Sequence, residues 1–124
     1  MATVTEWRTE IQTRLSTVVG QRAYAVWPRQ ISTPAAIVRF VDGTPADMSD
    51  GWDYRFDVLL FARLFDDISR GSAELDEYLP GGQNDVTAAL GGDAVEVESI
   101  GEYGTHEANG TQYMGMRVRV KVLE

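Results

Sequence analysis

The stretch MGMRVRVKV, residues 114–122, alternates apolar and basic side chains from Met116 onward. Successive side chains of a β-strand point to opposite faces of a sheet, so this pattern predicts a strand with one apolar face and one charged face. The charged face carries three of the eleven cations in a chain whose formal net charge is -8. A basic stripe in an acidic protein predicts acidic partners, either on the next strand or on another surface.

An Asn-Gly pair precedes this strand and is the strongest short sequence signal for a two-residue hairpin turn. With Asn109 and Gly110 at its centre, Ala108 faces Thr111 and the hairpin runs from Val95 to Leu123. The expected pairs farther out are Glu102 with Arg117, Glu98 with Lys121, Val97 with Val122 and Tyr103 with Met116. The alternative to an intersubunit role for these cations is a solvated, ion-paired face, on which each pair contributes roughly 0 to 1 kcal/mol.

The overall composition is that of an ordinary globular protein, and the length suits one domain spanning residues 1–124. The absence of cysteine excludes disulfides, thiolate nucleophiles and cysteine-based zinc sites. No apolar run approaches the roughly 20 residues of a membrane span, and Met1 to Glu10 lacks the apolar centre of a signal peptide. We expect a soluble protein with no membrane partner.

The acidic charge is concentrated in residues 64–107, which hold eleven acidic residues and a single cation, Arg70. Such a surface repels phosphate groups. Sequence-independent binding of nucleic acid needs a basic groove with interleaved aromatic residues, so the composition disfavours that class of function.

Apolar residues recur at spacings of three and four from Val4 to Val18, which predicts an amphipathic helix. Thr3 with Glu6 fits a capping box at its start, and Gly20 fits a left-handed stop at its end. Short strands are expected over residues 21–26 and 35–41, and an acidic connector over residues 42–51.

Aromatic and aliphatic side chains alternate with charged ones from Trp52 to Leu64, which predicts a long strand. At about 3.3 Å per residue it could extend on the order of 40 Å, so we expect part of it to project beyond the domain as a hairpin, with Trp52 and Tyr54 near its base or tip. Leu59 and Phe61 are apolar on the otherwise polar face. The second half of this strand should therefore be covered on both sides, and the helix expected within residues 66–79 is the available cover.

That helix contains Gly71, so we expect it to begin near Ser72, with Leu75 and Leu79 turned inward. One or two further helical turns are expected over residues 85–90. The sequence thus predicts an α+β domain: a mostly antiparallel sheet of four to five strands, with the helices packed on one face and a projecting β-hairpin.

Residues with catalytic potential are few. The only histidine, His106, lies beside the expected turn, and nothing in the sequence positions it against a nucleophile. The loop residues Asp47, Ser49 and Asp50 resemble part of a calcium loop but lack its full spacing, and no glycine-rich phosphate loop is present. We predict a protein that is not an enzyme, with no catalytic site, cofactor or metal.

Four loose patterns then suggest a relationship. They are an N-terminal helix that runs into Gly20-Gln21-Arg22-Ala23-Tyr24, a strand entry Thr33-Pro34-Ala35-Ala36-Ile37-Val38, a segment Leu75-Asp76-Glu77-Tyr78-Leu79, and a close Tyr113-Met114-Gly115 before the alternating strand. In their order and spacing, over almost the whole chain, they resemble the tail terminator proteins of long-tailed bacteriophages, particularly phages of actinobacteria.

This resemblance implies a structural virion protein that forms a homo-oligomeric, hexameric ring. The ring would cap the tail tube, contact the tail tube protein, and offer the surface that joins a head-completion or connector protein. It implies a location at the head-proximal end of the tail, after assembly in the host cytoplasm. DNA would pass through without specific binding, and no active site is carried over.

The ring hypothesis gives the charged and aromatic residues candidate roles. The expected subunit or tube contacts are Trp52, Tyr54, Arg55, Arg63, Arg117 and Arg119. The acidic loop residues Asp42, Asp47 and Asp50, or part of the acidic stretch 64–107, would line the lumen and keep DNA from adhering.

Three other functions fit the same sequence. Another virion connector, such as a head-closure or tail-completion protein, belongs to the same class. A small metal-dependent carboxylate hydrolase would show stabilisation by metal, which a ring subunit would not. A monomeric binding module would use the projecting hairpin as an edge for strand addition.

Overall fold

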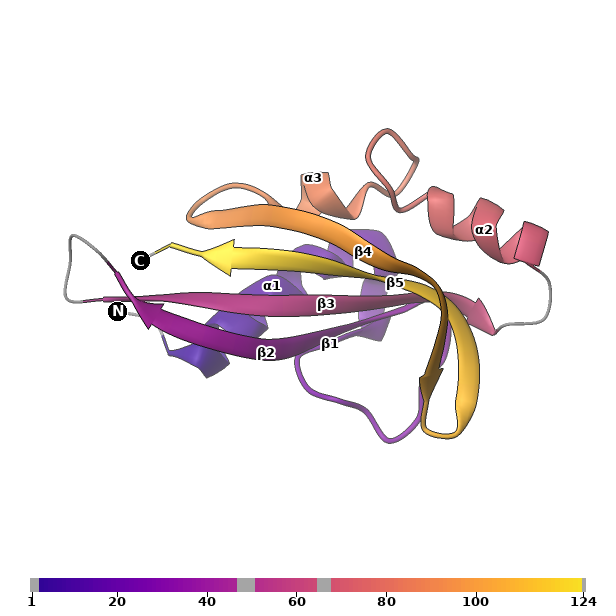
Figure 1. The fold of residues 1–124 in the computed structure, drawn as a ribbon, viewed down its shortest axis with the longest axis horizontal. Helices are drawn as coiled ribbons and strands as arrows, with labels where there is room; N and C mark the ends of the chain where they lie inside the picture. Colours follow the sequence, from indigo (N-terminus) through magenta and orange to yellow (C-terminus); the bar gives the residue numbers. More distant parts are fainter. Residues whose placement is uncertain (1–2, 47–50, 65–67, 124) are drawn as a thin grey trace.

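A computed structural model describes residues 3–46, 51–64 and 68–123, and confirms the predicted α+β class. One five-stranded sheet dominates the chain (Figure 1). The elements are α1 (Val4–Val19), a 3-10 turn (Gly20–Arg22), β1 (Ala23–Tyr24), β2 (Ala35–Pro45), β3 (Trp52–Leu64), α2 (Ile68–Asp76), α3 (Val86–Leu90), β4 (Val95–Ala108) and β5 (Thr111–Val122).

The strand order is β1-β2-β3-β5-β4, and neighbouring strands are antiparallel except β1 and β2. The strand expected over residues 21–26 is shorter than predicted, because residues 20–22 form the 3-10 turn and β1 pairs with β2 only at Ala36 and Ile37. β2 and β4 therefore lie at or near the two edges of the sheet.

Helix α1 begins and ends as the sequence predicted. The Thr3 side chain accepts a hydrogen bond from the Glu6 amide while the Glu6 carboxylate accepts one from the Thr3 amide, and Gly20 ends the helix with φ 64°. All three described helices contribute to one core on one sheet face. Its fully buried members are Ile11, Leu15, Ala36, Phe56, Val58, Leu60, Leu75, Val86, Leu90, Met116, Val118, Val120 and Val122.

Strand β3 has the predicted bounds, but β2 is longer than expected. Residues 42–45, which the sequence assigned to an acidic connector, continue β2 and pair with residues 52–55. The last pair between β3 and β5 joins Tyr54 to Val122, so residues 44–45 and 52–53 extend past β5. We call this extension the arm; it matches the predicted projecting hairpin (Figure 1).

Helix α2 begins at Ile68, not near Ser72. Gly71 remains helical because α2 packs closely on β5: a Cβ at this position would lie 2.9 Å from Cγ of Met114. Here a close contact between elements outweighs the low helix propensity of glycine. The short helix α3 is capped by Asp85, whose carboxylate accepts hydrogen bonds from the amides of Thr87 and Ala88.

The hairpin turn at Asn109-Gly110 is confirmed, with Ala108 opposite Thr111. The four pairs expected farther from the turn are wrong, because β4 shifts register twice, between Gly101 and Gly104 and between Val97 and Ser99. The observed pairs are Gly104 with Gly115, Gly101 with Arg117, Val97 with Val120, Glu96 with Lys121 and Val95 with Val122. Each shift inserts a bulge residue, which increases the local twist of the strand.

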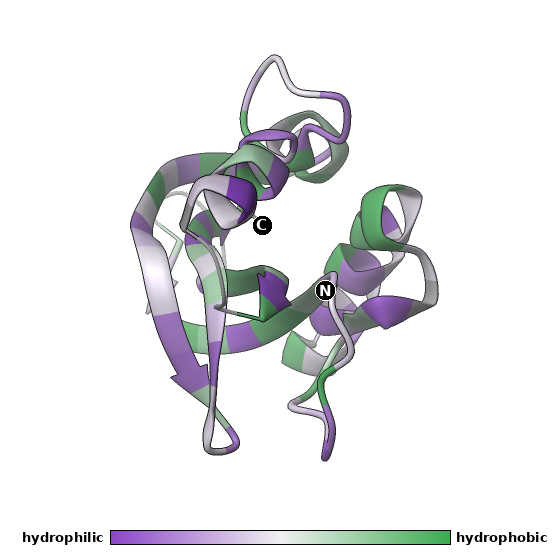
Figure 2. Cartoon of the chain, turned by 90° about the vertical axis from the view of Figure 1, so that its right-hand side faces the viewer, coloured by the Kyte–Doolittle hydropathy of each residue, from purple (hydrophilic) through white to green (hydrophobic). Residues whose placement is uncertain are grey.

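Beyond these bulges the hairpin bends over the sheet face that the helices leave open and approaches the loop between β1 and β2 (Figure 1). We call residues 105–114 the strap. An end-on view shows hydrophobic and hydrophilic residues alternating along the strands (Figure 2). Leu59 and Phe61 are buried on the open face, as predicted, but the cover is the strap and the β1–β2 loop, not the helix expected over residues 66–79.

Candidate functional site

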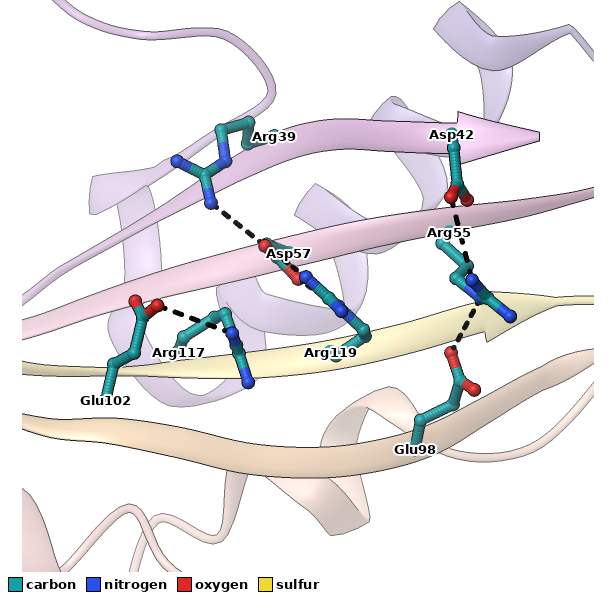
Figure 3. Close-up of polar contacts among 8 residues, drawn as sticks. All are labelled: Arg39, Asp42, Arg55, Asp57, Glu98, Glu102, Arg117 and Arg119. Atoms are coloured by element: carbon teal, nitrogen blue, oxygen red, sulfur yellow. Dashed lines mark hydrogen bonds and ion pairs between the residues drawn. The ribbon is translucent and has the colours of Figure 1, made fainter.

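The open face of the sheet carries a group of charged residues that the helices do not cover. We call it the charged face. Its members are Arg39, Asp42, Arg55, Asp57, Glu98, Glu102, Arg117 and Arg119 (Figure 3). They come from four strands, β2 to β5, because alternate positions of paired strands bring side chains to the same face.

Asp57 lies at the centre of the charged face and has an exposed fraction of 0%. One carboxylate oxygen accepts a hydrogen bond from Arg39 Nη2 at 2.9 Å and from Arg119 Nη2 at 3.2 Å. The other accepts a hydrogen bond from Arg119 Nε at 2.9 Å. Arg119 thus holds the carboxylate with two donors, and the Asp57 side chain ties β2, β3 and β5 together (Figure 3).

The pKa of Asp57 lies below its ordinary value. Burial acts to raise this pKa, but the hydrogen bonds and positive charges of Arg119 and Arg39 outweigh that effect. The same contact raises the pKa of Arg119. Two guanidinium groups around one carboxylate leave a net charge of +1, and the Arg39 side chain is 54% exposed. The centre of the face therefore consists of a buried, ionised carboxylate and an accessible guanidinium group, that of Arg39.

Arg55 joins both edges of the charged face. Its Nη1 lies 3.6 Å from the carboxylate of Asp42 on β2, and its Nε lies 3.3 Å from that of Glu98 near the other edge. Asp42 reaches this face because β2 shifts register between Phe40 and Asp42. Glu98 reaches it at a β4 bulge, so it pairs with Arg55 and not with Lys121 as the sequence predicted.

Arg117 and Glu102 form an ion pair of 3.4 Å, although the residue opposite Arg117 in the ladder is Gly101. The absence of a side chain at Gly101 gives the guanidinium its place: a Cβ there would lie 2.8 Å from Arg117 Nη2. The predicted charge contact is present, while the predicted backbone register is wrong.

Arg63 does not belong to the charged face. A register shift between Phe61 and Arg63 turns its side chain toward the helices, where Nη1 lies 3.0 Å from the Glu74 carboxylate on α2. Strict alternation along β3 predicted Arg63 on the same face as Arg55, so the structure separates two residues that the sequence grouped.

The aromatic candidates lie at the arm, on the face opposite the charges. Trp52 is 44% exposed, whereas Tyr54 is half-buried and meets Phe40 edge-to-face, with ring centroids 6.0 Å apart. Of the candidate lumen residues, Asp42 pairs with Arg55, and Asp47 and Asp50 lie outside the described residues.

His106 is a half-buried residue of the strap, and its ring lies 5.8 Å from that of Phe61. Its Nε2 is 2.5 Å from the Glu102 carbonyl oxygen. Among the described residues, no group of three or more histidines, aspartates and glutamates is placed to hold a metal ion. The described contacts of His106 are thus with a backbone carbonyl and an aromatic ring.

A cleft of about 380 Å³ between α1 and the turn before β4 is lined by Glu6, Trp7, Glu10, Arg14 and Asp93. The Arg14 side chain makes hydrogen bonds and an ion pair within this cleft. Its Nη1 donates to the carbonyl oxygens of Leu90 and Gly92 at 2.8 and 2.9 Å, and its Nε pairs with Glu10 at 3.0 Å. This arginine fastens α1 to the end of α3.

Sequence reasoning missed the two residues that organise the charged face, Asp57 and Arg39. The available signal was an acidic side chain in the middle of a long strand, opposite a basic residue of the preceding strand. Because a charged side chain on an alternating strand is normally solvated, the pattern does not distinguish a buried ion pair from an exposed one.

No protein-family model matches this chain, and a search of curated proteins finds no significantly similar sequence. Within the described residues, none of the helices combines the length and apolar character needed to span a membrane.

Proposed function

We propose that this chain is a ring-forming subunit of a bacteriophage tail terminator, which caps the tail tube and provides the surface that joins the head. The main support for this proposal is the charged face, which the helices leave open, together with the arm at the end of the same sheet. One sheet face is used for the core of the subunit, while the other face and the arm remain available to neighbouring subunits.

The two ends of the strand order support a ring geometry. Ring closure needs heterologous contacts, in which one patch meets a different patch of the neighbour. The β4 edge is acidic, with exposed Glu96, Glu98 and Glu107, whereas the β2 edge holds one exposed cation, Arg39, and one exposed anion, Asp42. These unlike edges fit a head-to-tail arrangement of copies better than a two-fold one.

The arm contributes an apolar anchor to the proposed contact. An exposed tryptophan is typical of the residues that dominate binding energy at interfaces. Trp52 meets this description, since 44% of its surface is accessible and it lies beyond the last pair of β5. Acidic residues near the arm would line the lumen and repel DNA.

The internal ion pairs guide the choice of variants. Reversing the charge of Arg117 or Arg119 would disturb Glu102 or the buried Asp57, so a loss of assembly would be ambiguous. Trp52 avoids this problem. Leu64 is the control, because it is 52% exposed on the same strand but lies at the end of β3 farthest from the arm.

The test is assembly of the purified chain, measured by mass alone and after mixing with polymerised tail tube protein. We expect Trp52→Ala to weaken ring formation at least about tenfold, as for an interface anchor, and Leu64→Ala to leave it unchanged. The proposal fails if the unsubstituted chain remains a monomer with the tube, or if both variants assemble as the parent does.

A further inference from the structure

The strap, residues 105–114, covers a small apolar cluster that is separate from the main core. The buried members of this cluster are Ile37, Leu59, Phe61, Ala108 and Tyr113. Two of them, Ala108 and Tyr113, belong to the strap itself. The main core lies on the other sheet face and includes none of the five.

Few contacts hold the strap down at its tip. The Trp27 indole Nε1 donates to Asn109 Oδ1 at 3.1 Å, and Asn109 Nδ2 donates to the Arg29 carbonyl oxygen at 3.2 Å. Both hydrogen bonds are exposed to water. Below the tip, the Tyr113 ring stacks on Phe61 with centroids 5.0 Å apart. Exposed hydrogen bonds and a small apolar contact are typical of a segment with low local stability.

The base of the strap has the features of a hinge. Gly104 and Gly115 face each other there, and Gly104 has φ 142°. Gly115 is held against β3, where a Cβ would lie 2.5 Å from the Leu60 carbonyl oxygen, so the bending falls on the β4 side at Gly104. The preceding bulge places Glu102 at φ 52°, a left-handed conformation that is strained for a residue other than glycine. Bulges and glycines at one level of a hairpin concentrate bending at that level.

We propose that the strap is a hinged cover: residues 105–113 open just beyond the Gly104–Gly115 level, with loss of the Leu64–Tyr113 pair, while Met114 stays in the main core and the rest of the sheet remains folded. Opening would uncover Ile37, Leu59 and Phe61 and extend the accessible charged face with an apolar strip. The device does not depend on the proposed ring function, because it follows from the contacts and hinge of the free chain.

The natural chain has no cysteine, so a single introduced thiol reports opening without background. Ala108 is 4% exposed on the inner side of the strap, and Ala36 is 0% exposed in the main core. With a thiol-reactive probe under native conditions, we expect Ala108→Cys to be labelled at least about tenfold faster than Ala36→Cys. Equal rates would show that the strap opens only with global unfolding and would overturn the proposal.

The two hydrogen bonds of Asn109 at the tip of the strap, which we call the latch, are tested by adding Asn109→Gly to the Ala108→Cys variant. Asn109 has φ 53°, which glycine adopts freely, so this change removes both tip hydrogen bonds and preserves the turn. We expect labelling to accelerate about three- to tenfold. The matched change Asn84→Gly, in the loop before α3, should leave the labelling rate of Ala108→Cys unchanged. Equal labelling rates for Ala108→Cys alone, with Asn109→Gly and with Asn84→Gly would show that these hydrogen bonds do not hold the strap closed.

A measurement on the unsubstituted chain tests strap opening without substitutions that could alter folding. Hydroxyl-radical footprinting compares Phe61, which is 1% exposed under the strap, with Phe56, which is 0% exposed in the main core. We expect oxidation of Phe61 to exceed that of Phe56 at least about tenfold. Equal protection of the two rings would contradict a strap that opens by itself.

Discussion

Two adjacent rows of the open sheet face have opposite environments. In one row Ile37 and Leu59 lie opposite each other beneath the strap, and in the next row Arg39 and Asp57 form an ion pair. The strands, the face and the backbone pairing are the same, and only two residues along each strand separate the rows. The segment that covers a strand, more than the strand itself, thus determines whether its residues are apolar or charged.

The largest expected effect comes from the apolar cluster beneath the strap, to which Ile37, Leu59 and Phe61 belong. Phe61→Ala removes a ring that is 1% exposed and stacked on Tyr113, so it should lower the free energy of unfolding by about 3 to 5 kcal/mol. Urea unfolding measures the change. Leu64→Ala, at a 52% exposed position of the same strand, should change stability by less than about 0.5 kcal/mol. Similar losses from both variants would contradict a buried apolar cluster.

The ion-paired row should be less costly to change. Asp57→Asn keeps the shape of the side chain but removes its charge, which weakens three hydrogen bonds from Arg39 and Arg119. We expect a loss of about 2 kcal/mol, moderated because the arginines can regain water. The control is Asp93→Asn in an exposed turn. A loss as large as that of Phe61→Ala would remove the contrast between the apolar cluster and the ion-paired row.

The unsubstituted chain and the Asp57→Asn variant should differ in how their stability depends on pH. The folded pKa of Asp57 is lowered, so its contribution to stability is complete above the unfolded pKa of about 4 and is lost as the pH falls through the folded pKa. The unsubstituted chain should therefore lose more stability than Asp57→Asn below about pH 4. Denaturant unfolding across this range checks the prediction, and parallel curves for the two proteins would refute it.

The smallest effect is expected where the charged face meets the strap hinge. Gly101→Ala places a Cβ 2.8 Å from Arg117 Nη2, at the far end of a flexible side chain that can move aside. The exposed ion pair with Glu102 would be lost at a cost of about 0.5 to 1 kcal/mol. Thermal unfolding measures the change; a cost above that of Asp57→Asn would show that Arg117 is held more rigidly than its contacts indicate.

The sequence predicted the parts of this fold that follow from local periodicity. The capping box at Thr3 and Glu6, the bounds of β3 and the turn at Asn109-Gly110 depend on neighbouring residues and are confirmed. The predicted double cover of Leu59 and Phe61 is also confirmed, because apolar residues on both faces of a strand require it. Which segment supplies the cover is a tertiary property, and that expectation was wrong.

The errors at the candidate site share one cause, the β-bulge. Single extra residues in β2, β3 and β4 brought Asp42 and Glu98 to the charged face and removed Arg63 from it. A bulge changes the face of every later residue while the sequence still alternates on each side of it. Its position depends on the twist and curvature of the whole sheet, so local patterns do not reveal it.

Electron microscopy of tail tubes mixed with the purified chain tests the central claim most directly. We expect a closed ring of several copies at one end of the tube, with the arm and charged face of each copy against its neighbour. Copies bound singly along the tube, or a ring in which the arm and charged face both point to solvent, would contradict it.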